Sequence, residues 1–167
     1  MAWTPTLNTI NARVIPDNLF AFFATNQADA FTWAGDSSLK LVKKFSDSVA
    51  NRSDPVFPAM SFSDDSSAED FTGDMNVALY QPTFEFMVTS LDPDEAVRES
   101  RLYAKAFASM ILNCPEATLL AGTSAAKAIV EDMTISYDPI RADEDQIDFM
   151  EMFHIRPTIR LEASAFV

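Results

Sequence analysis

The sequence predicts an α+β domain in which helices pack on one face of a single, mainly antiparallel sheet. Two segments space their apolar residues as amphipathic helices do, and four of the five expected strands alternate apolar and polar residues as half-buried strands do. The segments follow one another as helix, three strands, helix and two strands, an order typical of this fold class. The 167 residues suit one domain. We therefore expect an N-terminal arm at 1–15 and a single domain at 16–167.

The first helix is expected directly after the arm, which shows no sustained periodicity. Asp17 can cap a helix over residues 18–33, and Gly35 can end that helix in the left-handed conformation. The helix is rich in aromatic residues, most of which recur at a spacing of three to four. We interpret them as core residues, because large apolar side chains are usually buried.

Two short strands and a polar loop are expected next. Alternation predicts a strand at 39–45. A second short strand is expected at 56–62, where Pro55 and Pro58 confine it to a sheet edge or a bulge. The run at 64–74 is rich in Ser, Asp and Glu, which predicts a solvated loop. Its carboxylates lack the spacing that closes a calcium cage, so we predict no metal site there.

The middle of the chain is expected to form a long strand and a long helix. The pattern at 76–90 predicts a strand whose hydrogen-bond ladder is interrupted by Pro82. Asp92 is placed to cap a helix that begins at Pro93 and ends near Asn113. The buried stripe of this helix is expected to consist of Ala96, Val97, Tyr103, Ala104, Phe107, Met110 and Ile111.

The C-terminal part is expected to add two strands. Residues 123–128 suggest a helical turn, 130–137 a strand that the following Asp-Pro pair ends, and 142–146 a hairpin loop. At 147–165 apolar residues occupy nearly every odd position, which predicts one long half-buried strand. At about 3.3 Å per residue it would extend roughly 60 Å, whereas strands average about 5 to 6 residues. We expect its overhang to contact a neighbouring subunit.

Composition excludes several classes of function. The net charge is −13, and the 12 Lys and Arg residues are scattered, which argues against direct binding of nucleic acid. A single cysteine, Cys114, excludes an internal disulfide, and we interpret it as a buried apolar residue. No signal peptide, membrane span, P-loop or dinucleotide fingerprint is present. We expect a soluble protein made in a reducing cytoplasm.

The sequence marks no catalytic constellation. His154 is the one histidine, and no Gly-x-Ser-x-Gly elbow presents a serine to it. One imidazole cannot build a multi-histidine metal site, so we expect His154 to be a surface or interface residue. The 25 carboxylates include no pair that the pattern marks as buried or facing. We predict no catalytic residue, no cofactor and no metal.

A family resemblance runs through about two thirds of the chain, from Phe57 onward. It comprises Phe57-Pro58-Ala59-Met60, an acidic stretch, the strand at 80–88, the capped helix that begins with Asp92-Pro93-Asp94-Glu95-Ala96, and the long final strand. This order resembles the tail terminator and tail-completion proteins of tailed bacteriophages, which lie between the tail tube and the head-side connector. The aromatic helix at 19–33 and the region at 36–54 depart from the family pattern.

The resemblance implies a structural virion protein without catalysis, made in the host cytoplasm. Six copies would form a ring that caps the tail tube and joins it to the head-side neck, and DNA would pass through the ring. The negative charge would either keep the free protein soluble or line that channel. The arm at 1–10 and the loop at 64–74 are expected to hold no core residues. Candidate subunit and partner contacts are Trp3, Asp64, Asp65, Glu69, Asp70, Phe71, His154, Arg156 and Arg160.

Three alternatives stay open at this point. Another neck, head-closure or tail component would share the sheet-and-helix design and differ in which surface meets which partner. A small-ligand-binding α+β domain would use the Phe-lined face of the sheet as its pocket. A carboxylate enzyme would need paired acids with raised pKa values.

Overall fold

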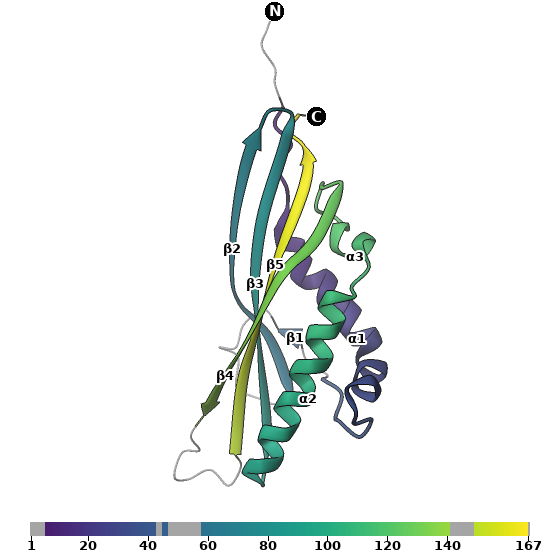
Figure 1. Ribbon diagram of the computed structural model, residues 1–167, viewed down its shortest axis with the longest axis vertical. Coiled ribbons are helices and arrows are strands. Elements are labelled where there is room, and N and C mark those ends of the chain that lie inside the picture. Colours follow the sequence, from purple (N-terminus) through teal and green to yellow (C-terminus); the bar gives the residue numbers. More distant parts are fainter. Residues whose placement is uncertain (1–5, 43–44, 47–57, 141–148, 167) are drawn as a thin grey trace, which may run out of the picture.

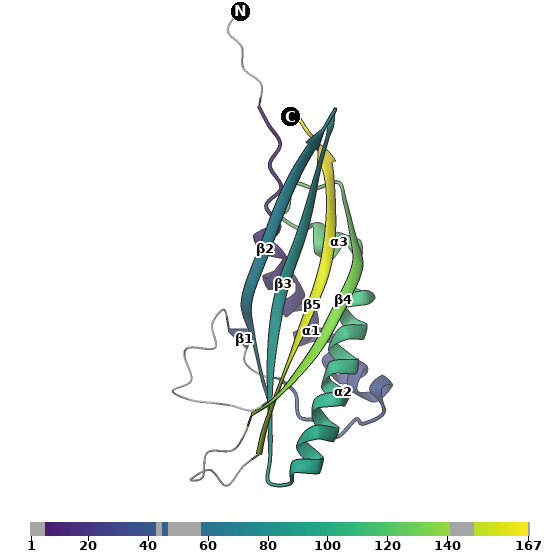
Figure 2. The ribbon, with the colours of Figure 1, turned by 60° about the vertical axis from the view of Figure 1, so that its left-hand side comes forward.

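A computed structural model describes residues 6–42, 45–46, 58–140 and 149–166, and it confirms the predicted α+β class (Figure 1). In this described part, five strands form one sheet in the order β1-β2-β3-β5-β4. All neighbours in the sheet are antiparallel except β1 and β2. Figures 1 and 2 show the helices on one side of the sheet, which makes a two-layer molecule.

The hairpin of β2 (Ala59–Thr72) and β3 (Met75–Ser90) corrects the loop prediction at 64–74. All of β2 pairs with β3, and the connection is a two-residue turn in which Gly73 has φ 62°. Side chains 66–72 are exposed because β2 lies near the sheet edge, so their polar character reflects an edge strand. The prediction of a strand at 56–62 is confirmed from residue 59 onward, with a register shift after Phe62. Residues 56 and 57 lie outside the described part.

The strand predicted at 39–45 is wrong over residues 39–42, which form a loop. Leu39 and Val42 are buried there, and the Gln27 side chain binds both backbone polar groups of Val42. Among the described residues between α1 and β2, β1 (Phe45–Ser46) is the one strand, and it pairs with the start of β2. The two sets of alternating residues do not form two faces, because Leu41 is 46% exposed whereas Val42, from the other set, is buried.

The sheet is completed by β4 (Lys127–Ile140) and β5 (Phe149–Ser164), with β5 between β3 and β4. The predicted helical turn at 123–128 is wrong, because β4 begins inside it. The predicted stop at the Asp-Pro pair is also wrong: β4 is an edge strand, where proline is tolerated. The loop expected at 142–146 lies outside the described residues.

The expected interruption at Pro82 is confirmed. The β3–β5 ladder pairs Tyr80 with Ile159 and resumes with Phe84 and Ile155. Continuing that register places Pro82 opposite Pro157, so neither strand has an N–H group to donate at this point. The Gln81 Nε2 group donates to Thr158 Oγ1 at 2.9 Å and bridges the gap with a side-chain hydrogen bond.

The first helix, α1 (Ile15–Ala34), begins three residues earlier than predicted and follows the short helix η1 (Ala12–Val14). Asp17 is therefore not its cap but lies in its first turn, where Pro16 sets the backbone. The predicted left-handed stop is confirmed: Gly35 has φ 115°, and its N–H group donates to the carbonyl oxygen atoms of Phe31 and Thr32.

The second helix, α2 (Pro93–Leu112), is confirmed with its cap and is followed by the short α3 (Glu116–Leu120). The Asp92 Oδ1 atom accepts the N–H groups of Asp94 and Glu95 at 2.9 and 3.5 Å, which satisfies donors at the helix start. The expected stripe of α2 is buried except for Val97, which is 39% exposed.

An aromatic core lies between the helices and the sheet. The Phe107 ring of α2 packs edge-on against Phe23 of α1 at 5.2 Å and tilted against Phe86 of β3 at 4.7 Å. Phe86 in turn stacks on Phe153 of β5 at 4.6 Å, so one chain of rings joins both layers. The Phe-lined face of the sheet is thus occupied by helices rather than open to a ligand. Buried aromatic residues of this core include Phe20, Phe23, Phe31, Tyr80, Phe84, Phe86, Tyr103, Phe107 and Phe153.

Residues 6–15 pack against the sheet end that holds the β2–β3 turn. The Asn8 N–H group donates to Ala165 O at 3.0 Å, and the buried Asn76 amide donates to Asn8 O at 2.8 Å. Ile10 is 6% exposed and belongs to the core. The expectation that 1–10 holds no core residue is therefore wrong at Ile10.

Candidate interaction surfaces

The sheet has an open face opposite the helices. Even-numbered residues of β3 from Asn76 to Val88 and odd-numbered residues of β5 from Phe153 to Ala163 point toward the helices and are buried, so their alternates form the other face. Within the described residues, no helix covers that face (Figure 2). The open face therefore presents rows of side chains from β2, β3, β5 and β4 to solvent.

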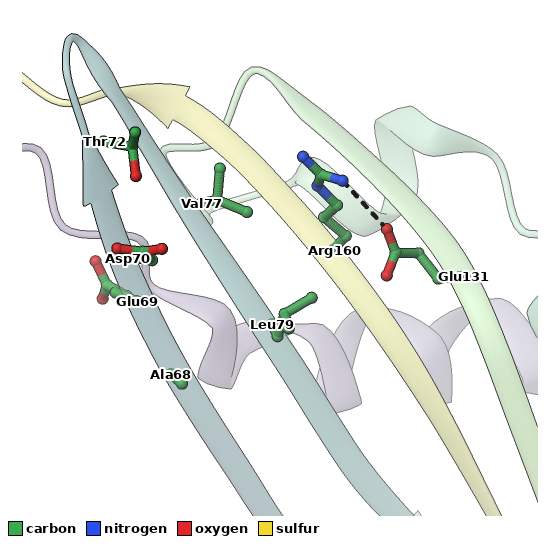
Figure 3. A pocket seen from close by; sticks show the side chains of 8 residues that line it. All are labelled: Ala68, Glu69, Asp70, Thr72, Val77, Leu79, Glu131 and Arg160. Carbon is green, nitrogen blue, oxygen red and sulfur yellow. Dashed lines mark hydrogen bonds and ion pairs between the residues drawn. The ribbon is translucent and has the colours of Figure 1, made fainter.

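Near the β2–β3 turn the open face carries both apolar and charged side chains. Leu79 of β3 and Ile129 of β4 lie on either side of Arg160 of β5, and they are 44% and 40% exposed. They adjoin a shallow hollow of about 500 Å³ on this face (Figure 3). The hollow is lined by Ala68, Glu69, Asp70, Thr72, Val77, Leu79, Glu131 and Arg160.

Arg160 is paired within its own sheet. Its guanidinium lies 3.5 Å from the Glu131 carboxylate on β4 (Figure 3). It also lies 3.0 Å from the carboxylate of Glu162 on β5. The arginine is 40% exposed, so these pairs position the side chain more than they stabilise the fold. Two acids for one cation leave this part of the open face negative.

His154 lies between two carboxylates on the open face. Its Nε2 atom is 3.1 Å from Glu85 on β3, and its Nδ1 atom is 3.3 Å from Asp138 on β4. The imidazole thus links three neighbouring strands. Arg156, two residues further along β5, is exposed and has no ion pair with any residue that the structure describes. Of the two, Arg156 is the better placed to bind a partner's carboxylate.

The candidate residues of β2 have different surroundings. Glu69 accepts the Ile10 N–H group at 3.4 Å and the Asn76 amide at 2.6 Å, so it ties the N-terminal segment to the sheet. Asp65 lies 3.9 Å from Arg13. Asp70 and Phe71 are exposed. Asp64 is described only as a strand position, and Trp3 lies outside the described residues.

Exposed apolar side chains gather at the turn end of the sheet. Half of the large hydrophobic residues that are exposed in the described ranges lie there. Leu7 pairs with Phe166, Leu79 and Ile129 lie on either side of Arg160 on the open face, and Phe71 and Met75 lie next to the turn on opposite faces of the hairpin. We call this surface the end patch. It comprises Leu7, Phe71, Met75, Leu79, Ile129 and Phe166, which are 40% to 53% exposed.

Sequence reasoning identified Phe71 in the end patch and missed the other five residues. A signal was present at the start of β3, where Met75, Val77 and Leu79 are apolar at the alternating positions that should face water. That signal marks a strand with two apolar faces at one end. Leu7, Ile129 and Phe166 join the patch through tertiary pairing.

Cys114 is expected to react slowly with alkylating reagents in the folded protein. Burial raises the pKa of its thiol to about 11, because a buried site disfavours the thiolate. The reactive thiolate is then about two orders of magnitude scarcer at pH 8 than for an unperturbed thiol. Iodoacetamide labelling followed by mass spectrometry, in buffer and in urea, checks this expectation. Equal rates in the two solutions would contradict it.

The described part of the chain holds no group of three or more His, Cys, Asp and Glu side chains arranged to bind a metal ion. None of its helices has the length and apolar character needed to cross a bilayer. The sequence matches no model of a known protein family and is similar to none of the curated proteins.

Proposed function

We propose that the protein is a structural subunit that assembles with copies of itself into a ring, as tail terminators of tailed bacteriophages do. The ring would cap the tail tube and join it to the head-side connector in the virion, with DNA passing through. The end patch carries this proposal. Clustered apolar side chains exposed at one end of a domain are typical of a protein–protein contact.

Two further features support assembly. The β2–β3 turn lies beyond the helices at the upper end of the sheet (Figure 1), so the end patch is accessible to a second molecule. The outer edge of β4 is unpaired over its length among the described residues, and Pro139 and the acids Glu131, Asp132 and Asp138 discourage indiscriminate strand addition there. A subunit with such an edge would bind its partners through specific side-chain surfaces rather than by strand addition.

The purified protein is expected to have a mass of several copies by multi-angle light scattering, rising with concentration, and to show rings by negative-stain microscopy. Leu79→Ser should raise the concentration needed for assembly at least tenfold, because it puts a polar group into the end patch. Leu91→Ser is the matched control, since Leu91 is 73% exposed and lies at the opposite end of β3. A monomer at every soluble concentration would refute the proposal.

A further inference from the structure

The helical side of the molecule carries a basic, aromatic surface. Trp33 at the end of α1 is 60% exposed, and the Lys105 Nζ atom of α2 lies 4.9 Å from the centre of its ring. One turn earlier, the Arg101 guanidinium covers the Tyr137 ring of β4 at 3.3 Å. Leu112, at the end of α2, is 57% exposed. We call Trp33, Arg101, Lys105 and Leu112 the helix patch.

The helix patch stands out in a chain with 25 acids. Residues 100–115 contain two cations and no carboxylate. Arg98 does not belong to the patch, because Asp36 and Glu95 already bind its guanidinium at 2.8 and 2.6 Å. Exposed tryptophan and arginine are the residue types most enriched where protein interfaces are tightest. A partner for this surface must be acidic and partly apolar.

The β2–β3 hairpin has that chemistry. Residues 53–97 contain no Lys or Arg, and the hairpin carries Asp70 and Asp74 beside the exposed apolar residues Phe71 and Met75. Its tip thus combines negative charge with the end patch. The two surfaces match in both charge and hydrophobicity.

Within one copy the tip cannot reach the helix patch. β3 runs for 16 residues from the turn to the start of α2, which is roughly 50 Å. α2 then returns along the sheet, and Lys105 lies roughly 18 Å from its start. About 30 Å therefore separates the tip from Lys105 in the same molecule. The match must be made between molecules.

We infer that the hairpin tip of one copy docks on the helix patch of the next. The contact joins two different surfaces, so it repeats head to tail and closes into a ring when the rotation between copies allows. It rests on the proposed function and names the surfaces that build the ring. Asp74 would lie near Lys105 of the next copy, with the end patch against Trp33 and Leu112.

Charge reversal tests the contact. Lys105→Glu and Asp74→Lys should each stay monomeric where the unchanged protein assembles, and an equimolar mixture should recover the assembled mass, because each variant then supplies the charge that the other needs. Lys105→Arg and Asp74→Glu are the controls that keep the charge, and they should assemble normally. A variant that failed to fold could not be restored by mixing. If both charge-reversed variants assembled at the same concentration as the protein without substitutions, the inference would be overturned.

Cysteine trapping separates this inference from the proposed function. In a Cys114→Ser background, Asp74→Cys and Lys105→Cys molecules mixed under mild oxidation should form a disulfide-linked dimer, and neither alone should do so. If the disulfide-linked dimer forms but the protein without substitutions is monomeric by light scattering, the ring is refuted and the contact stands. Assembled protein without the trapped dimer, or with dimers of a single variant, would refute the contact and keep the ring.

Discussion

Replacing Phe107 with alanine is expected to lower the free energy of unfolding by about 3 to 5 kcal/mol, the usual cost of deleting a buried phenylalanine ring. Phe107 is fully buried and touches three rings from two elements, those of Phe23 and Phe31 in α1 and Phe86 in β3. Its loss would leave a cavity where α1, α2 and the sheet meet. In a chain of this size the thermal midpoint should fall by roughly 6 to 20 °C.

Phe71→Ala is the matched control for this prediction. The same atoms are removed from a ring that is 42% exposed at the hairpin tip, so the free energy of unfolding should change by less than about 1 kcal/mol. Urea unfolding of both variants, at a concentration that keeps the protein monomeric, provides the comparison. Equal losses would show that Phe107 does not hold the two layers together.

The sequence predicted the elements whose burial pattern arises within one segment. β3 and β5 alternate over 16 residues each, and the helix layer buries one set of side chains along most of their length. α2 carries its own start signal, because the Asp92 carboxylate binds donors only two and three residues away. Such signals do not depend on what the rest of the chain does.

The incorrect predictions concern segments whose structure depends on their position in the fold. Residues 64–72 are polar because β2 lies near an edge, and the same composition is typical of a loop. Leu39 and Leu41 alternate with Lys40 and Val42, but the residues that are buried are Leu39 and Val42, which come from opposite sets. Leu41 is 46% exposed, so the alternation does not mark the two faces of a strand. A single sequence does not specify which strand will be at the edge or which loop will pack against a helix.

The candidate contacts were predictable in part. Alternation along β5 correctly placed His154, Arg156 and Arg160 on the polar face. It could not show that Glu85 and Asp138 flank His154, because those acids come from β3 and β4 and meet it only through register. The helix patch was also missed, since it needs the end of α1 to lie beside the middle of α2.

The Gln27 side chain is expected to have the second large effect on stability. It is 5% exposed, its Nε2 group donates to Val42 O at 3.1 Å, and its Oε1 atom accepts the Val42 N–H group at 2.9 Å. Gln27→Met keeps the size of the side chain and removes both bonds. Two buried backbone groups then lose their partners at about 1 to 3 kcal/mol each, so the free energy of unfolding should fall by about 2 to 6 kcal/mol.

The test combines urea unfolding with hydrogen exchange. In the variant the Val42 amide should lose protection through local opening, whereas amides in the middle of β3 should still exchange only through global unfolding. Gln81→Met is the matched control: its amide bonds a hydroxyl group on the open face, where water can replace the partner, so the loss should stay below about 1 kcal/mol. Unchanged protection at Val42 would show that Gln27 does not hold the loop.

The same substitution should also affect assembly. If the loop is released, the segment that follows Trp33 and contains Asp36 loses its attachment to α1. Assembly through the helix patch should then weaken more than the fall in stability explains.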